Sequence, residues 1–212
     1  MTRDRPPSHA GRPRAPAPDE RTCDHSHRGA VPRRAVLRAG GVAAAAVLAG
    51  CSSGSSSAPD PITLTGSLQC DVCGMVIESH PGPDGQIFYA DNSPANHDNP
   101  ARFDSLKRCL FPYLFEHQQQ GWTAAAIYAT DYSSVEYTVR TEGDQALISS
   151  HPEASAFADA TDLHYVVGSD VAGAMGPDFV PFSKRADADS FAGEYGGDVV
   201  AFDEIGPTLV GR

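Results

Sequence analysis

Short apolar runs separated by turn residues occupy most of residues 62–206 and predict a chain of short strands. Each run is rich in Val, Ile, Leu, Ala or aromatic residues and is bounded by Gly, Pro, Asn, Asp or Ser. The runs are LQCDVCGMVI (68–77), GQIFYAD (85–91), WTAAAIYATDY (122–132), LHYVVGSD (163–170), DFVPFS (178–183) and DVVAFDEI (198–205). In the first of them, the two ends have the strand-like pattern.

Two other segments have apolar residues at helical spacing. In FDSLKRCLFPYLFEHQQ (103–119), the apolar face consists of Leu106, Leu110, Tyr113 and Leu114. Asp104 or Ser105 suits the N-cap of this helix, and Pro112 predicts a kink or an early break. The second segment, ADADSFAGEYGG (186–197), predicts a helix that ends at its glycines.

The order of these elements predicts an α+β fold in which a β-β-α-β unit occurs twice. We expect the first unit over residues 62–134, and a linker followed by the second unit over 135–212. Residues 135–160 have no clear assignment. Two small units of this kind would share a core or pack side by side.

The first 50 residues differ in composition and predict an N-terminal extension with an export signal. Arg33 and Arg34 precede a Gly/Ala/Val run that ends in LAGC, a pattern typical of a twin-arginine lipoprotein signal. This pattern predicts that Cys51 is lipidated and becomes the first mature residue. The apolar run is shorter than the roughly 20 residues of a membrane-spanning helix. Residues 51–61 are rich in Ser, Gly and Pro and predict a flexible tether.

Removal of residues 1–50 makes the remaining chain strongly acidic. It would keep seven basic and 23 acidic residues, for a net charge of −16. High salt screens such self-repulsion, so a hypersaline exterior or an ordinary acidic secreted domain both fit. Nucleic-acid binding is disfavoured, because no basic stripe remains to neutralise phosphates.

The sulfur residues carry the candidate chemistry. Cys70, Cys73 and Met75 lie within the six residues CDVCGM, and Met175 lies beside a glycine at the matching place in the second predicted unit. A Cys70–Cys73 disulfide would close a loop too small to stabilise the fold much. Zinc needs four ligands, and a thioredoxin-like motif should open a helix, whereas this one leads into a strand-like run.

Cu(I) fits this donor set better than zinc, because thiolates and thioethers are the soft ligands that select it. One thiolate and two neutral thioethers cancel the charge of the ion, so such a site can be shielded from water. A site with three ligands also leaves a position at which the ligand of an acceptor can enter.

Four blocks of the chain, in order, resemble the nitrous oxide reductase accessory lipoprotein family, NosL. They are CDVCGMVI, HPGPDGQ, YVVGSDVAGAMGPDFVPF and ADADSFAGEYGGDVVAFDEI, and the resemblance covers roughly residues 66–206. It implies two β-β-α-β halves and a Cu(I) site formed by Cys73, Met75 and Met175. Cys70 is a candidate fourth donor or a guard of the site. The helix opening RFDSL, with Cys109 one turn later, departs from the family pattern, and Cys109 suits a small core residue.

These observations predict a protein that is not an enzyme but an exported, lipid-anchored Cu(I) metallochaperone. The resemblance implies a location at the outer face of the cytoplasmic membrane. It also implies delivery of copper to nitrous oxide reductase or to its membrane-bound assembly machinery. The alternative is an extracytoplasmic thiol-disulfide oxidoreductase that uses Cys70 and Cys73, and such an enzyme would need no methionine.

Overall fold

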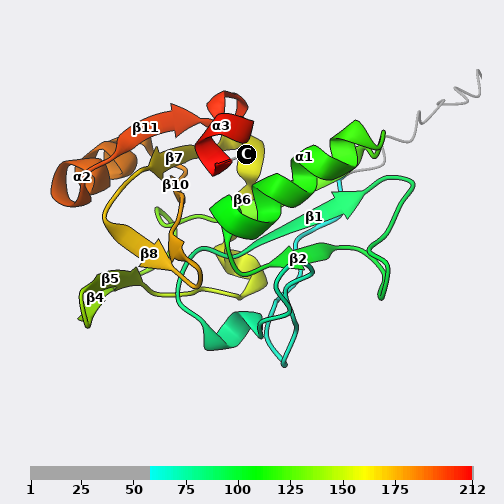
Figure 1. Ribbon diagram of the computed structural model, residues 1–212, viewed down its shortest axis with the longest axis horizontal. Coiled ribbons are helices and arrows are strands. Elements are labelled where there is room, and N and C mark those ends of the chain that lie inside the picture. The colour runs from blue at the N-terminus through cyan, green and yellow to red at the C-terminus, as the bar shows by residue number, and fades with distance from the viewer. Residues whose placement is uncertain (1–57, 212) are drawn as a thin grey trace, which may run out of the picture. The chain divides into compact units, whose positions relative to one another are not determined.

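A four-stranded antiparallel sheet begins the fold (Figure 1), which the computed structural model describes over residues 58–211. Strand β1 (Gly85–Tyr89) lies between β2 (Ala101–Phe103) and β3 (Ala124–Thr130), and β6 (Phe157–Asp159) pairs with the other edge of β3. All five residues of β1 are buried, as expected for a central strand. The predictions for Arg33, Arg34 and Cys51 concern residues outside the described range.

Two further sheets complete the fold. In the first, β7 (His164–Val167) lies between β10 (Val180–Phe182) and β11 (Asp198–Ala201), and both pairings are antiparallel. The second has the order β4-β5-β8-β9, with β5 and β8 parallel. Its strands are β4 (Val139–Glu142), β5 (Gln145–Ile148), β8 (Val171–Gly173) and β9 (Gly176–Pro177).

The helices follow the strands that they cover. A π-helical turn (Leu106–Leu110) leads directly into α1 (Phe111–Gln119), while α2 (Arg185–Tyr195) packs on the β10-β7-β11 sheet and α3 (Pro207–Val210) contacts α1. Single 3-10 turns cover Ile77–Ser79, Ala154–Ala156, Ala160–Asp162 and Phe202–Glu204. Within residues 58–211, no helix has the length and apolar character needed to cross a bilayer.

One hydrophobic cluster joins the start of α1 to the second half of the chain. The ring of Phe111 lies 5.7 Å from that of Tyr165, 5.8 Å from Phe179 and 5.6 Å from Phe202, measured between centroids. A second, smaller cluster lies under α2 and includes Phe182 and Phe191. Residues 58–211 belong to one compact unit, and burial of these aromatic rings is the main force that holds it together.

The mixed helix-and-sheet class predicted from the sequence is confirmed, as are five of the six strand segments and both helices. The exception is LQCDVCGMVI, where one antiparallel bridge, between Gln69 and Val76, replaces the expected strands. A tight turn with Gly74 at φ +75° occupies the middle of this run, so the backbone cannot stay extended. The unassigned stretch 135–160 contains β4, β5 and β6.

Candidate metal centre

The Cys70–Met75 segment is a closed loop held by its own backbone. The N–H of Cys70 donates to the carbonyl of Met75, and the N–H of Gly74 donates to the carbonyl of Cys70, each at 2.9 Å. Val72 lies at the tip of the loop and is 49% exposed, whereas Cys70 is only 3% exposed. The loop therefore turns Cys70 inward and leaves Cys73 half-buried at the protein surface.

Asp71 attaches this loop to strand β2. One carboxylate oxygen accepts the N–H of Arg102 at 2.7 Å, and the N–H of Asp71 donates to the carbonyl of Arg102 at 2.9 Å. The other carboxylate oxygen lies 2.7 Å from Nε2 of His97. These contacts fix the position of the loop relative to the residues that follow β2, which are Asp104 and the π-helical turn.

The π-helical turn places Cys109 beside the loop. Ser105 is its N-cap, and its hydroxyl accepts the N–H of Arg108 at 3.1 Å. The N–H of Leu110 donates to the carbonyl of Ser105 at 3.0 Å, a bond that spans five residues rather than four. Pro112, at the start of α1, has no N–H to give to the turn before it, so the regular helix begins there without a lost hydrogen bond.

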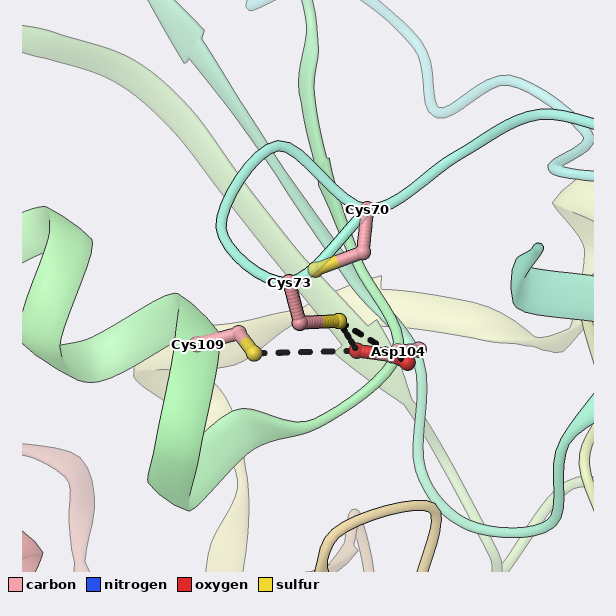
Figure 2. Close-up of side chains that lie close together, drawn as sticks. All are labelled: Cys70, Cys73, Asp104 and Cys109. Atoms are coloured by element: carbon pink, nitrogen blue, oxygen red, sulfur yellow. Dashed lines mark hydrogen bonds between the residues drawn. The ribbon is translucent and has the colours of Figure 1, made fainter. Parts of the chain in front are cut away.

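Three thiols and one carboxylate come together at this point, as Figure 2 shows for Cys70, Cys73, Asp104 and Cys109. One ligand atom from each of the four lies within 4.8 Å of the others. The thiol of Cys73 lies 3.3 and 3.4 Å from the two carboxylate oxygens of Asp104, and that of Cys109 lies 3.6 Å from one of them. All three cysteines are free thiols.

Met175 adds a thioether to this cluster from the other half of the chain. It lies in the tight turn between β8 and β9 and is 40% exposed. The thiol of Cys109 donates to its sulfur at 3.6 Å. The cluster of Cys70, Cys73, Cys109 and Met175, which we call the sulfur cluster, therefore joins segments that are far apart in the sequence.

Two contacts fix the turn that carries Met175. The carboxylate of Asp178 accepts the N–H of Lys107 at 2.7 Å, which ties this segment to the π-helical turn. In addition, the backbones of Gly82 and Gly173 are in close contact, so that a Cβ added at Gly82 would lie 2.6 Å from the Cα of Gly173. The first contact joins a buried carboxylate to a backbone N–H and the second joins two backbones, and together they fix the segment that carries Met175.

The three thiols differ in their ease of ionisation. Hydrogen bonding from Cys109 lowers the pKa of Cys70 to about 7, whereas burial is the main cause that raises the pKa of Cys73 to about 12. The hydrogen bond to Cys70 also raises the pKa of Cys109. A metal ion that binds Cys73 must therefore displace a firmly held proton.

A hollow of about 550 Å³ lies against the outer side of the loop. Its lining includes Cys70, Cys73, Asn96, His97 and Arg102. The imidazole of His97 is held by Asp71 and by the carbonyl of Asp98, at 2.7 Å each, and lies outside the group of four ligand atoms. The hollow gives another molecule access to the loop without displacing the core.

Of the predicted ligands Cys73, Met75 and Met175 and the candidate Cys70, the structure brings Cys70 and Cys73 together and places Met175 against Cys109, while the ligand set itself stays a prediction. Met75 lies in the same loop and is half-buried, and its thioether accepts no hydrogen bond from the described residues. The sequence reasoning missed Asp104 and Cys109, which it interpreted as a helix cap and a core residue. Cys109 is indeed fully buried, but its thiol faces the sulfur cluster.

Comparisons with known proteins identify the family. The family model described as NosL matches residues 61–210. The chain belongs to the NosL family. The copper-binding lipoprotein NosL of Stutzerimonas stutzeri is 30% identical over 159 residues, which are 71% of this chain and 68% of that protein. The protein of the same name from Achromobacter cycloclastes is 32% identical over 169 residues, 79% of each chain.

A solved structure shows the same NosL fold. The crystal structure of the copper chaperone NosL from Shewanella denitrificans has 27% sequence identity and a TM-score of 0.52. The match covers 68% of this chain and 94% of that one. The resemblance to NosL on the sequence blocks alone is thereby confirmed.

Proposed function

We propose that this chain is a Cu(I) metallochaperone of the NosL family, built from two β-β-α-β units. The observation that supports this most is the sulfur cluster, in which three thiols and a thioether from three separate segments converge. Donors of this kind select Cu(I) over harder and more abundant ions. The names of the relatives, copper-binding lipoprotein and copper chaperone, point to the same cargo.

The order of the strands supports the two-unit interpretation. In the sheet β2-β1-β3-β6, β1 lies between β2 and β3, and α1 connects β2 to β3 along the chain. In the sheet β10-β7-β11, β7 lies between β10 and β11, and α2 connects β10 to β11 along the chain. The sulfur cluster takes Cys73 and Cys109 from the first half and Met175 from the second. Its formation therefore requires both halves to be folded.

The exposure of the donors suits transfer of the ion as well as binding. Cys73 is half-buried beside the hollow, and Met175 lies on the solvent side. A neutral thioether is the donor that an incoming ligand displaces at the lowest electrostatic cost, because no charge separates when it leaves. An acceptor can thus form its first bond to copper before the thiolate of this chain dissociates from the ion.

Export and anchoring belong to the same proposal. We infer that lipidated Cys51 holds the protein at the outer face of the cytoplasmic membrane, with residues 51–61 as a tether. There it delivers copper to nitrous oxide reductase or to the membrane-bound machinery that assembles it. The support comes from the LAGC signal and from the two relatives named as lipoproteins.

Deletion of the gene tests this function in the host. The reductase purified from a copper-limited deletion strain should be exported but short of copper, and added copper should partly restore its activity. Re-introduction of the wild-type gene should restore the metal content, whereas a Cys51→Ser gene should restore less, because the product is no longer held at the membrane. A full copper complement in the deletion strain would show that this protein is not the donor.

The two methionines provide a test of the ligand set. Replacement of Met75 or Met175 with leucine keeps the apolar volume and removes a sulfur donor, so the fold should survive. Each change should lower the Cu(I) affinity by about tenfold or more, measured anaerobically in competition with a chromogenic Cu(I) chelator. If both variants bind Cu(I) within about twofold of the wild type, the methionines are not ligands.

The oxidoreductase alternative has one observation in its favour, which is the lowered pKa of Cys70. Its weakness is access, because Cys70 is 3% exposed and no helix begins at the motif. The activity of an enzyme of this class should not change in Met175→Leu. The methionine variants therefore separate the two functions.

A further inference from the structure

We propose that Cys109 is a further copper ligand in this chain, so that two thiolates, Cys73 and Cys109, hold the ion together with the proposed methionine donors. This inference rests on the proposed Cu(I) function and deepens it. The family resemblance did not assign Cys109 to the site.

The direction of the Cys109 side chain is the first argument. A buried cysteine is ordinarily a small apolar residue that packs against other apolar groups. The thiol of Cys109 instead lies 3.6 Å from a carboxylate oxygen of Asp104 and 3.6 Å from the sulfur of Met175. Its backbone belongs to the core, while its sulfur is part of the polar cluster.

The pairing with Met175 is the second argument. Among the described cysteines, Cys109 is the one whose thiol donates to that thioether. If Met175 binds copper, the sulfur that already touches it lies within reach of the same ion. The hydrogen bond from the N–H of Lys107 to the carboxylate of Asp178 and the contact of Gly82 with Gly173 fix the segments that carry the two sulfurs.

The charge of such a site is the third argument. Two thiolates and one Cu(I) leave a net charge of −1, which needs compensation in a partly buried place. The backbone N–H of Met75 donates to the sulfur of Cys73 and offsets part of this charge. The solvent side of the cluster, at Cys73 and Met175, remains partly hydrated.

The location of Cys109 gives this ligand a separate role. Cys73 and Met175 lie toward the solvent, whereas Cys109 is fully buried beneath them. Of the proposed ligands, Cys73 is the one that lines the hollow, so an acceptor that approaches there meets Cys73 first, and Cys109 would be the last to release the ion. The structure thus assigns retention of the ion to the buried thiolate and exchange to the outer donors.

The test is an anaerobic Cu(I) competition titration of the full mature chain, with wild type, Cys109→Ser and Cys109→Ala compared. Both variants should lose at least about tenfold in affinity, and the loss should be non-additive with that of Met175→Leu if both residues hold one ion. Val72→Ala is the control, because it changes the exposed tip of the loop without removing a donor atom and should leave the affinity within about twofold of the wild type.

A second measurement uses the wild type and does not depend on a variant that folds. In weakly buffered solution at a pH where the thiols are protonated, each thiolate ligand releases one proton as copper binds. The wild type should release about two protons per Cu(I), and Cys109→Ser about one. Wild-type affinity in Cys109→Ser, or release of a single proton by the wild type, would overturn this ligand. Failure of the wild type to bind Cu(I) would instead overturn the proposed function.

Discussion

Replacement of Cys73 with serine should lower the Cu(I) affinity by more than about a hundredfold, since loss of a ligand costs more than loss of a supporting residue. Cys73 is the most exposed thiol of the sulfur cluster, and its sulfur lies 3.3 Å from a carboxylate oxygen of Asp104. A serine hydroxyl cannot ionise at neutral pH and is a hard donor that Cu(I) binds weakly. The same anaerobic competition titration measures the loss.

The control for this variant is Val72→Ala, at the neighbouring position of the loop. Val72 is 49% exposed and offers no donor atom, so its truncation should leave the affinity within about twofold of the wild type. Thermal unfolding of both apo variants checks that the loop and core are intact. If Cys73→Ser binds Cu(I) as well as Val72→Ala does, Cys73 is not a ligand.

Replacement of Gly82 with alanine should destabilise the fold by about 2–5 kcal/mol, the sum of overpacking and backbone strain. Gly82 has φ +116°, and its Cβ would lie 2.6 Å from the Cα of Gly173 and 3.1 Å from the N of Ala174. Backbone atoms cannot move aside as a side chain can. Because Ala174 precedes Met175, the same change should also weaken Cu(I) binding.

Gly143→Ala is the matched control for the second prediction. Gly143 also has a positive φ, +62°, but nothing lies within 4 Å of its Cβ position in the β4–β5 turn. Its replacement should cost only the conformational strain, about 1–2 kcal/mol. Urea unfolding of the apo proteins gives both values. Equal losses in the two variants would show that the contact between Gly82 and Gly173 contributes nothing.

The sequence was sufficient for the elements whose apolar pattern is strong. Strand β1 and the helix over 186–197 have clear periodicity and turn residues at their ends, and both form as expected. The run 68–77 has strand-like ends in sequence but forms only one bridge, because its apolar residues flank a turn whose shape depends on hydrogen bonds within the loop. Local patterns do not report such closure.

The candidate site was predictable only where its residues lie close together in the sequence. Cys70, Cys73 and Met75 stand out as a motif, and Met175 stands out through its matching place in the second half. By contrast, Cys73 meets Asp104 across 31 positions and Cys109 meets Met175 across 66, contacts that only the folded chain creates. Cys109 had one signal in the sequence, which is a third thiol in a domain that already carries a soft-metal motif.

The π-helical turn before α1 sets the rotational phase of Cys109. A regular α-helix advances about 100° per residue, and a turn closed over five residues holds one residue more than the regular repeat. A chain one residue shorter here could close a regular turn, with Phe111 still in the core, but its thiol would point about 100° away from Met175. The length of this segment is therefore as much a part of the copper site as its cysteine. An insertion or deletion in this segment would therefore disturb the site even if every sulfur donor were kept.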